Sequence, residues 1–170
     1  IETAVISVTM IHAGEATNVV PDFCEIQGTV RTFTTEVLDL IERRMRSIAE
    51  NTCAAFEAGC EFEFRRNYPA TVNHPAETEF ARQLLGEVVG AENVLEFEPT
   101  MGSEDFSYFL QAKPGCYFLI GNGDGTHREG GHGLGPCMLH NPSYDFNDEL
   151  IPLGATAWVR LAEKWLGTAR

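Results

Sequence analysis

The chain has 170 residues, of which 44% are hydrophobic and 22% charged, proportions typical of a globular protein with one domain or two small ones. Its formal net charge of −13 disfavours nucleic acid and anionic membranes as partners, because both bind clustered Lys and Arg. No apolar run approaches the roughly 20 residues that span a bilayer. The five cysteines are scattered without a CxxC spacing, which suits free thiols in a reducing cytoplasm.

The first 70 residues predict the order β-β-α-β. A half-buried strand is expected over 4–11, because one of its faces is apolar: Ala4, Ile6, Val8 and Met10. The segment "FCEIQGTVRTF" predicts a second strand. A helix capped by Thr34 or Thr35 follows, with apolar residues spaced by threes and fours, and Gly59 is expected to end it. "CEFEFRR" alternates strictly, which predicts a third strand with one solvent-exposed face.

The second half alternates helix and strand, which favours an α/β layer. After a proline-marked break at "NYPATVNHPAE", Pro75 begins a predicted helix that ends near Val89. Residues 93–97 are interpreted as a short strand, and Ser103 is expected to cap a short helix. The apolar run "CYFLIG" is typical of a strand buried on both faces. A glycine-rich loop and a final amphipathic helix complete the chain.

The segment "CMLHNPSYDFND" places His140 between the glycine-rich loop and several acidic residues. A neutral imidazole is a common zinc ligand, but one zinc needs three or four protein ligands. The alternative is a loop histidine bonded to a carboxylate. Asp145 and Asp148 are candidates to orient the ring, or else turn and cap residues of the final helix. His127 and His132 lie among glycines and are interpreted as solvated rather than ligating.

Two further groups carry candidate chemistry. In "MGSEDFSYF", Glu104 and Asp105 stand at a predicted helix start, where they either cap the helix beside Ser103 or form one wall of a pocket. Asn18 in a loop and Arg31 at a strand end could converge on one anion, which an arginine grips bidentately. The alternative is a turn residue and a surface charge.

In their order along nearly the whole chain, these segments resemble one family. They are "HAGEATNVVPDFCEIQGTVRTF", "YPATVNH", "MGSEDFSYF", "GNG" and "LHNPSYDFND". The family is the dinuclear-metal exopeptidases that include hippurate hydrolases, N-acyl-amino-acid amidohydrolases and indole-acetyl-amino-acid hydrolases. The resemblance implies an α/β fold with an α+β lid. Residues 1–71 would be part of a ferredoxin-like lid or dimerisation domain, and 72–170 the C-terminal segment of a zinc-exopeptidase α/β/α sandwich.

The resemblance also implies roles for individual residues. His140 matches the family's last metal ligand. The other matches bind substrate: Asn18 and Arg31 hold its carboxylate, and Gly102, Ser103 and Glu104 belong to the pocket segment. The implied cofactors are two divalent metal ions (zinc, manganese, cobalt or nickel). The implied partners are a small N-acyl amino acid and a second copy of the protein, joined through the lid.

We therefore expect the C-terminal part of a cytoplasmic, metal-dependent amidohydrolase that cleaves N-acyl amino acids with a metal-activated water. The family's early metal motifs and its general-base glutamate have no match in these 170 residues. No catalytic residue is assigned, and the isolated chain is expected to be inactive with its metals incompletely bound. The alternative is a non-catalytic dimerisation module or a small-molecule-binding module.

Overall fold

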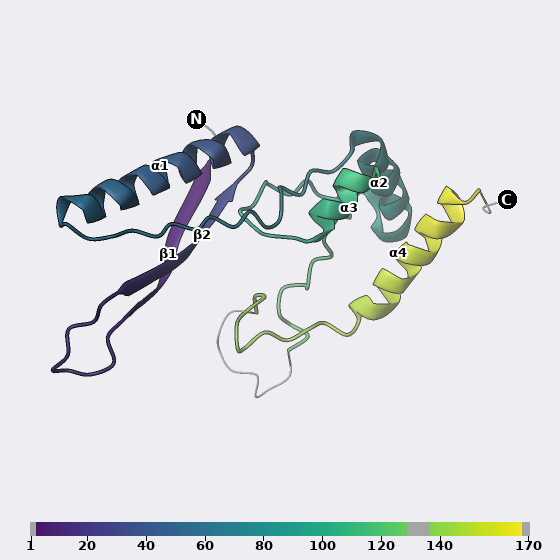
Figure 1. Cartoon of the computed structure of the whole chain (residues 1–170). Coiled ribbons are helices and arrows are strands. Elements are labelled where there is room, and N and C mark those ends of the chain that lie inside the picture. Colours follow the sequence, from purple (N-terminus) through teal and green to yellow (C-terminus); the bar gives the residue numbers. More distant parts are fainter. Residues whose placement is uncertain (1–2, 129–136, 168–170) are drawn as a thin grey trace. The chain divides into compact units, whose positions relative to one another are not determined.

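The computed structural model describes residues 3–128 and 137–167, and the chain divides into two compact units (Figure 1). The first unit contains Ile1–Val72 and Glu98–Ala112, and the second contains Asn73–Phe97 and Lys113–Arg170. Helices and a small antiparallel sheet together give the mixed α/β class that the sequence predicts. The two compact units also divide near residue 72, but Glu98–Ala112 groups with the first unit. The predicted domain boundary after residue 71 stays a prediction.

The first unit is built on an antiparallel hairpin of β1 (Ala4–Ala13) and β2 (Cys24–Thr32). Its register shifts between Val8 and Met10, which leaves a β-bulge in β1. Gly28 pairs with Val8 at this point, and a Cβ there would overlap the carbonyl oxygen of Ser7. A bulge brings the two backbones this close only where one of them lacks a side chain.

The strand prediction for β1 is right, but the burial expected of its apolar face is wrong. Ile6 is 53% exposed and Val8 62%, whereas Val5 and Ser7 on the opposite face are half-buried. Alternation identifies a strand and its two faces, but not which of them finds a covering layer.

Helix α1 (Thr35–Ala55) follows β2 and contacts it. Thr34 is the N-cap, and its hydroxyl accepts a hydrogen bond from the backbone N–H of Val37 at 3.4 Å. The apolar stripe recurs every three or four residues, as a helix that packs one face requires. The predicted helix and one of the two predicted caps are therefore confirmed.

The end of α1 differs from the prediction. Glu57, not Gly59, adopts the left-handed conformation, with φ 57°. Its N–H bonds the carbonyl of Ala54 at 3.1 Å, and the N–H of Ala58 bonds that of Cys53 at 3.0 Å. These two bonds define a Schellman motif, which reverses the chain directly after the helix. Glycine favours this position, but the paired hydrogen bonds hold a glutamate there instead.

Residues 60–66, here called the return segment, do not form the predicted third strand. Arg46 of α1 donates to the carbonyl of Phe62 at 3.3 Å, and its guanidinium lies 4.7 Å from the centre of the Phe62 ring. Arg66 forms an ion pair with Glu42 at 2.6 Å. Side chains of α1 thus hold the return segment where, among the described residues, no strand pairs with it.

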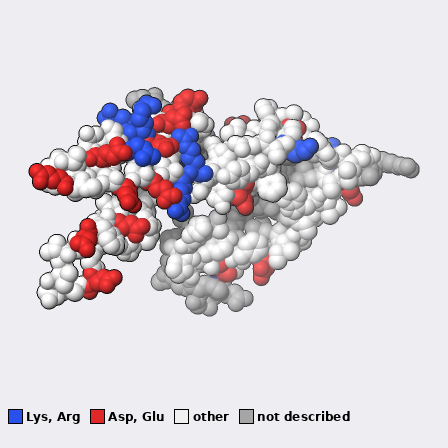
Figure 2. All heavy atoms as spheres, in the orientation of Figure 1, with Lys and Arg blue, Asp and Glu red and all other residues white. Residues whose placement is uncertain are grey.

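On the face of the first unit that Figure 2 shows, basic side chains lie beside acidic ones. One arginine of α1 and both arginines of the return segment form ion pairs: Arg46 with Glu50, Arg65 with Glu63, and Arg66 with Asp39 and Glu42. Such exposed pairs contribute little to stability, typically about 0–1 kcal/mol. Their consequence here is to cancel the local positive charge.

The second unit packs α2 (Pro75–Val89) against α4 (Leu150–Trp165). Phe80 meets Trp165 edge to face at 5.3 Å, and Glu87 forms an ion pair with Lys164 at 2.7 Å. Three residues of these two helices form the buried core of the unit: Ala81, Leu84 and Ala157. In the described part of the chain, no helix is both long and apolar enough to cross a membrane.

Both strands predicted for the second half are absent. Asn93 ends a short 3-10 helix, η1 (Ala91–Asn93), and residues 94–97 follow it without forming a ladder. The run "CYFLIG" (116–121) is irregular, with Leu119 57% exposed. The side chain of Asn73 takes the place of a neighbouring strand for Tyr117. Its amide oxygen accepts from the N–H of Tyr117 and its amide nitrogen donates to the carbonyl, both at 2.8 Å.

The bulge gives a first prediction. Gly28→Ala should lower the free energy of unfolding by about 1–3 kcal/mol, because the new methyl group forces the two strands apart. Gly59→Ala is the matched control, since a Cβ at that position meets nothing within 4 Å. Chemical denaturation measures both. Equal stability of the two variants would contradict the close approach at Gly28.

Candidate functional site

Arg31, at the end of β2, connects the hairpin to the predicted pocket segment. Arg31 is half-buried as a residue, and its Nη1 donates to the carbonyl of Met101 at 2.9 Å and to the hydroxyl of Ser103 at 3.2 Å. These partners lie 70 and 72 residues away in the sequence but in the same unit. The structure therefore brings Arg31, Gly102 and Ser103 together.

Glu104, unlike its neighbour Ser103, forms hydrogen bonds with the start of the following helix. Its carboxylate accepts from the N–H of Phe106 at 3.4 Å, and its carbonyl accepts from the hydroxyl of Ser107 at 2.7 Å. These bonds start α3 (Phe106–Ala112). The predicted Ser103 cap is wrong: the Ser103 hydroxyl bonds Arg31, and Glu104 holds the helix start. A residue at a helix start caps it only when no stronger donor claims its oxygen.

Asn18 is not near Arg31. It is exposed in the loop between β1 and β2, at the far end of the hairpin from Arg31 (Figure 1). At roughly 3.3 Å per residue, about 23 Å of strand separates Cys24 from Arg31. One hairpin therefore does not present both side chains to one carboxylate. The role of Asn18 in substrate binding stays a prediction.

His140 is exposed and adopts a left-handed backbone conformation, with φ 66°. A turn holds it there, in which the N–H of Asn141 bonds the carbonyl of Met138 at 3.2 Å. A non-glycine residue in this conformation costs of order 1 kcal/mol or more, and such strain clusters at functional sites. Among the described residues, however, no three His, Cys, Asp or Glu side chains lie close enough to bind a metal. The residues present do not fit a complete metal centre. His132 lies outside the described residues.

His127 is half-buried and hydrogen-bonded, so its interpretation as a solvated residue is wrong. Its Nε2 lies 3.0 Å from the carbonyl oxygen of Asp145, which also accepts from the amide of Asn122 at 2.8 Å and from the thiol of Cys137 at 3.3 Å. The amide oxygen of Asn122 accepts from the N–H of Asn147 at 2.9 Å. The contacts of His127 and Asn122 tie the glycine-rich loop to the segment that carries His140, and the Cys137 thiol bonds within that segment.

The start of α4 also differs from expectation. The N-cap position is Glu149, which makes no side-chain capping bond, and the amide oxygen of Asn147 accepts from its N–H at 3.2 Å. Asp148 contributes its backbone carbonyl, which accepts from Ile151 at 3.1 Å. The side-chain cap predicted for Asp148 is thus absent. In this segment it is the asparagines that hold the backbone by their side chains.

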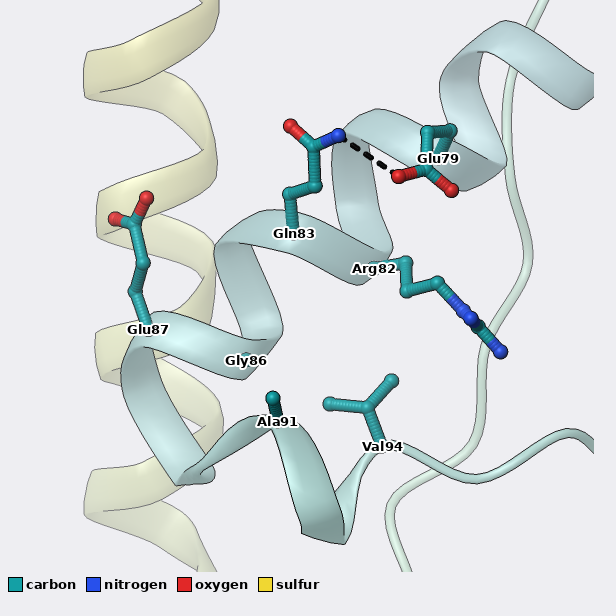
Figure 3. Close-up of a pocket in the computed structure, with 7 residues that line it drawn as sticks. All are labelled: Glu79, Arg82, Gln83, Gly86, Glu87, Ala91 and Val94. Carbon is teal, nitrogen blue, oxygen red and sulfur yellow. Dashed lines mark hydrogen bonds between the residues drawn. The ribbon is translucent and has the colours of Figure 1, made fainter.

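A shallow groove of about 440 Å³ lies on α2 and η1 (Figure 3). Glu79 and Gln83 are bonded to each other along one side at 2.7 Å, and Arg82 points across the groove. Lys164 holds the pKa of Glu87 below its usual value by hydrogen bonding and charge, so this carboxylate stays ionised. No residue implied to bind metal or substrate lines the groove.

Comparison with known proteins identifies the family. Residues 3–164 match the model of peptidase family M20/M25/M40, and the chain belongs to this family. It is 36% identical over 168 residues to thermostable carboxypeptidase 1 of Saccharolobus solfataricus, covering 97% of this chain and 40% of that protein. It is 33% identical over 171 residues to IAA-amino acid hydrolase ILR1-like 4 of Arabidopsis thaliana, covering 98% and 37%.

A solved relative supports the same assignment. A dinuclear metal-binding M20 peptidase from Bacillus subtilis matches with a TM-score of 0.72 and 27% identity, over 97% of this chain and 42% of that one. The family resemblance and the α/β fold are therefore confirmed. The chain spans about two fifths of the length of these relatives.

Asn122 is the residue of this region that sequence reasoning missed, although it lies in the quoted "GNG". Asn122→Ala removes two hydrogen bonds to the backbone and should lower the free energy of unfolding by about 1–3 kcal/mol. Amide hydrogen exchange should increase most over 137–147. Asn51→Ala is the control, because its amide bonds only Ser47 on the exposed side of α1. Unchanged exchange over 137–147 would exclude the tethering role of Asn122.

Proposed function

We propose that this chain forms part of a metal-dependent amidohydrolase that cleaves the amide bond of N-acyl amino acids. Membership of the M20 family and the similarity to an IAA-amino acid hydrolase support this reaction class. The observation that carries the proposal is that Arg31, a half-buried residue, has its guanidinium anchored beside the predicted pocket segment. An N-acyl amino acid carries a free carboxylate next to the scissile amide, and Arg31 supplies the matching cation.

The geometry around Arg31 suits that role. Both hydrogen bonds of the Arg31 side chain use Nη1, and among the described residues Nε and Nη2 have no hydrogen-bond partner. A carboxylate can therefore bind the remaining N–H groups while Met101 and Ser103 keep the guanidinium in place. Partial burial reduces screening by water and strengthens the pair. Holding the carboxylate orients the amide, which lowers the entropic part of the barrier.

The described residues do not supply all the ligands that the proposed metal ions need. His140 is the candidate ligand, and its strained backbone conformation agrees with a functional constraint. One imidazole does not bind two metal ions, so the remaining ligands would come from outside the described residues. We propose zinc, manganese, cobalt or nickel and derive no catalytic step through them. Metal analysis of the intact protein tests this.

The role of Arg31 is tested by kinetics of the intact enzyme that carries this chain. Arg31→Ala should raise KM for an N-acyl amino acid roughly 10- to 100-fold, because a hydrogen bond to a charged group contributes about 1.5–3 kcal/mol. The same variant should discriminate less against a substrate whose carboxylate is replaced by an amide.

Arg43→Ala is the matched control, since Arg43 is an exposed arginine of the same unit on α1. It should leave KM unchanged. If Arg31→Ala keeps the original KM for carboxylate substrates, Arg31 does not bind the substrate carboxylate. That result would leave open only a structural role in holding Met101 and Ser103.

We also propose that the intact protein is a cytoplasmic homodimer joined through the first unit. The outer edge of β1 has no strand partner among the described residues, and the apolar residues beside it are exposed: Ile6, Val8, Met10 and Ile11. An unpaired apolar edge readily pairs with a second copy. The cytoplasmic assignment rests on the free thiols.

Val8→Lys should weaken such a dimer at least about tenfold, because a charge on the edge opposes strand pairing. Sedimentation equilibrium measures the dissociation constant. Ala58→Lys adds the same charge on an exposed turn and should not change it. A protein that stays monomeric without any substitution contradicts the dimer. A dimer without hydrolase activity in the intact protein favours the alternative, a non-catalytic module.

A further inference from the structure

Asn122 is the only asparagine of the chain that precedes a glycine, and its side chain is bonded at both ends. Its amide oxygen accepts from the N–H of Asn147 at 2.9 Å, and its amide nitrogen donates to the carbonyl of Asp145 at 2.8 Å. The same nitrogen donates to the sulfur of Cys137 at 3.6 Å. All three partners lie in the segment 137–147, so the amide group of this one residue holds that segment.

Gly123 places an accessible backbone nitrogen directly after this amide. The residue is exposed, has φ 83°, and its N–H has no hydrogen-bond partner among the described residues. A glycine carries no side chain that would shield its nitrogen from the residue before it. In an Asn–Gly pair this nitrogen can attack the side-chain carbonyl carbon of the asparagine and close a five-membered ring. The pair at 122–123 thus contains both the nucleophile and the electrophile of a deamidation.

The hydrogen bond from Asn147 favours this attack. Negative charge develops on the amide oxygen as the nitrogen of Gly123 adds to the carbon, and a backbone N–H already placed on that oxygen stabilises the charge. The bond to Asp145 acts in the opposite direction, because the amide nitrogen must separate from that carbonyl before it leaves. We therefore expect the reaction during local openings of this contact, which need far less free energy than global unfolding.

We propose that Asn122 is a site of spontaneous deamidation that releases the segment carrying His140. The nitrogen of Gly123 forms a bond to Cγ of Asn122, and its proton passes through solvent to the amide nitrogen. The bond from Cγ to Nδ2 breaks, and the nitrogen leaves as ammonia. A water molecule then opens the resulting succinimide at either of its carbonyl groups, which leaves aspartate or isoaspartate at position 122.

Neither product can replace the amide of Asn122. An ionised carboxylate has no hydrogen to donate, so the bond to the carbonyl of Asp145 is lost and two oxygen atoms face each other. Isoaspartate also inserts the side-chain methylene into the backbone, which moves the remaining carboxylate away from Asn147. The contact of His127 with Asp145 then stays as the other connection to this segment. The inference rests on these hydrogen bonds and does not depend on the reaction proposed for the intact enzyme.

Peptide mapping of the intact protein tests the modification. Folded and denatured samples are incubated in mildly alkaline buffer and digested, and the peptides are analysed by mass spectrometry, with isoaspartate detected by enzymatic methylation. We expect conversion at Asn122 in the folded protein to precede conversion at every other asparagine, including the exposed Asn67, which is followed by tyrosine. A folded protein that keeps the amide of Asn122 for as long as the denatured sample takes to lose it would overturn the proposal.

Asn122→Asp tests the structural consequence, because it carries one of the two products from the start. Amide hydrogen exchange over 137–147 should increase at least about fivefold, the factor that corresponds to the loss of about 1 kcal/mol. Asn67→Asp is the matched control. It makes the same change of charge at an exposed asparagine of the first unit, whose side chain has no hydrogen-bond partner among the described residues, and should leave this exchange unchanged. Equal exchange over 137–147 in the two variants would overturn the proposed release.

Discussion

Every extended segment must find hydrogen-bond partners for its backbone N–H and C=O groups, and this constraint shapes both units of the protein. Only β1 and β2 satisfy it as strands among the described residues. The return segment and the run 116–121 satisfy it in part through side chains. Arg46 serves the carbonyl of Phe62, and Asn73 serves both backbone groups of Tyr117. Arg46 thereby connects α1 to the return segment, and Asn73, just before α2, connects the chain there to a segment 44 residues further on.

The site depends on the same requirement that polar groups find hydrogen-bond partners. Arg31 holds the pocket segment because a partly buried charged side chain needs hydrogen-bond acceptors. Here the acceptors are the carbonyl of Met101 and the hydroxyl of Ser103. Asn122 does the equivalent for the segment that carries His140. In both places one side chain with several donors or acceptors replaces a regular ladder. Residues matched to substrate and metal roles therefore stand on backbone that is irregular but firmly bonded.

Local patterns predicted the helices and the two strands of the hairpin well and the remaining strands poorly. The spacing of apolar residues and Thr34 specify α1, and Pro75 specifies the start of α2, because helices bond within themselves. Strands bond to other strands, so "CEFEFRR" and "CYFLIG" have the composition of strands without forming them here. The caps assigned to Ser103, Asp148 and Gly59 were wrong for a related reason. Several nearby groups could serve each helix end, and only the folded chain shows which one does.

By itself, the sequence determined the family, the α/β class, the helices and the list of candidate residues, since these depend on residue types and their order. Only the tertiary structure decided which candidates meet. It brought Arg31 to Ser103 across more than seventy residues and left Asn18 at the far end of the hairpin. The reason is physical: proximity between distant residues follows from strand direction, chain reversal and side-chain hydrogen bonds, none of which is a property of a local pattern.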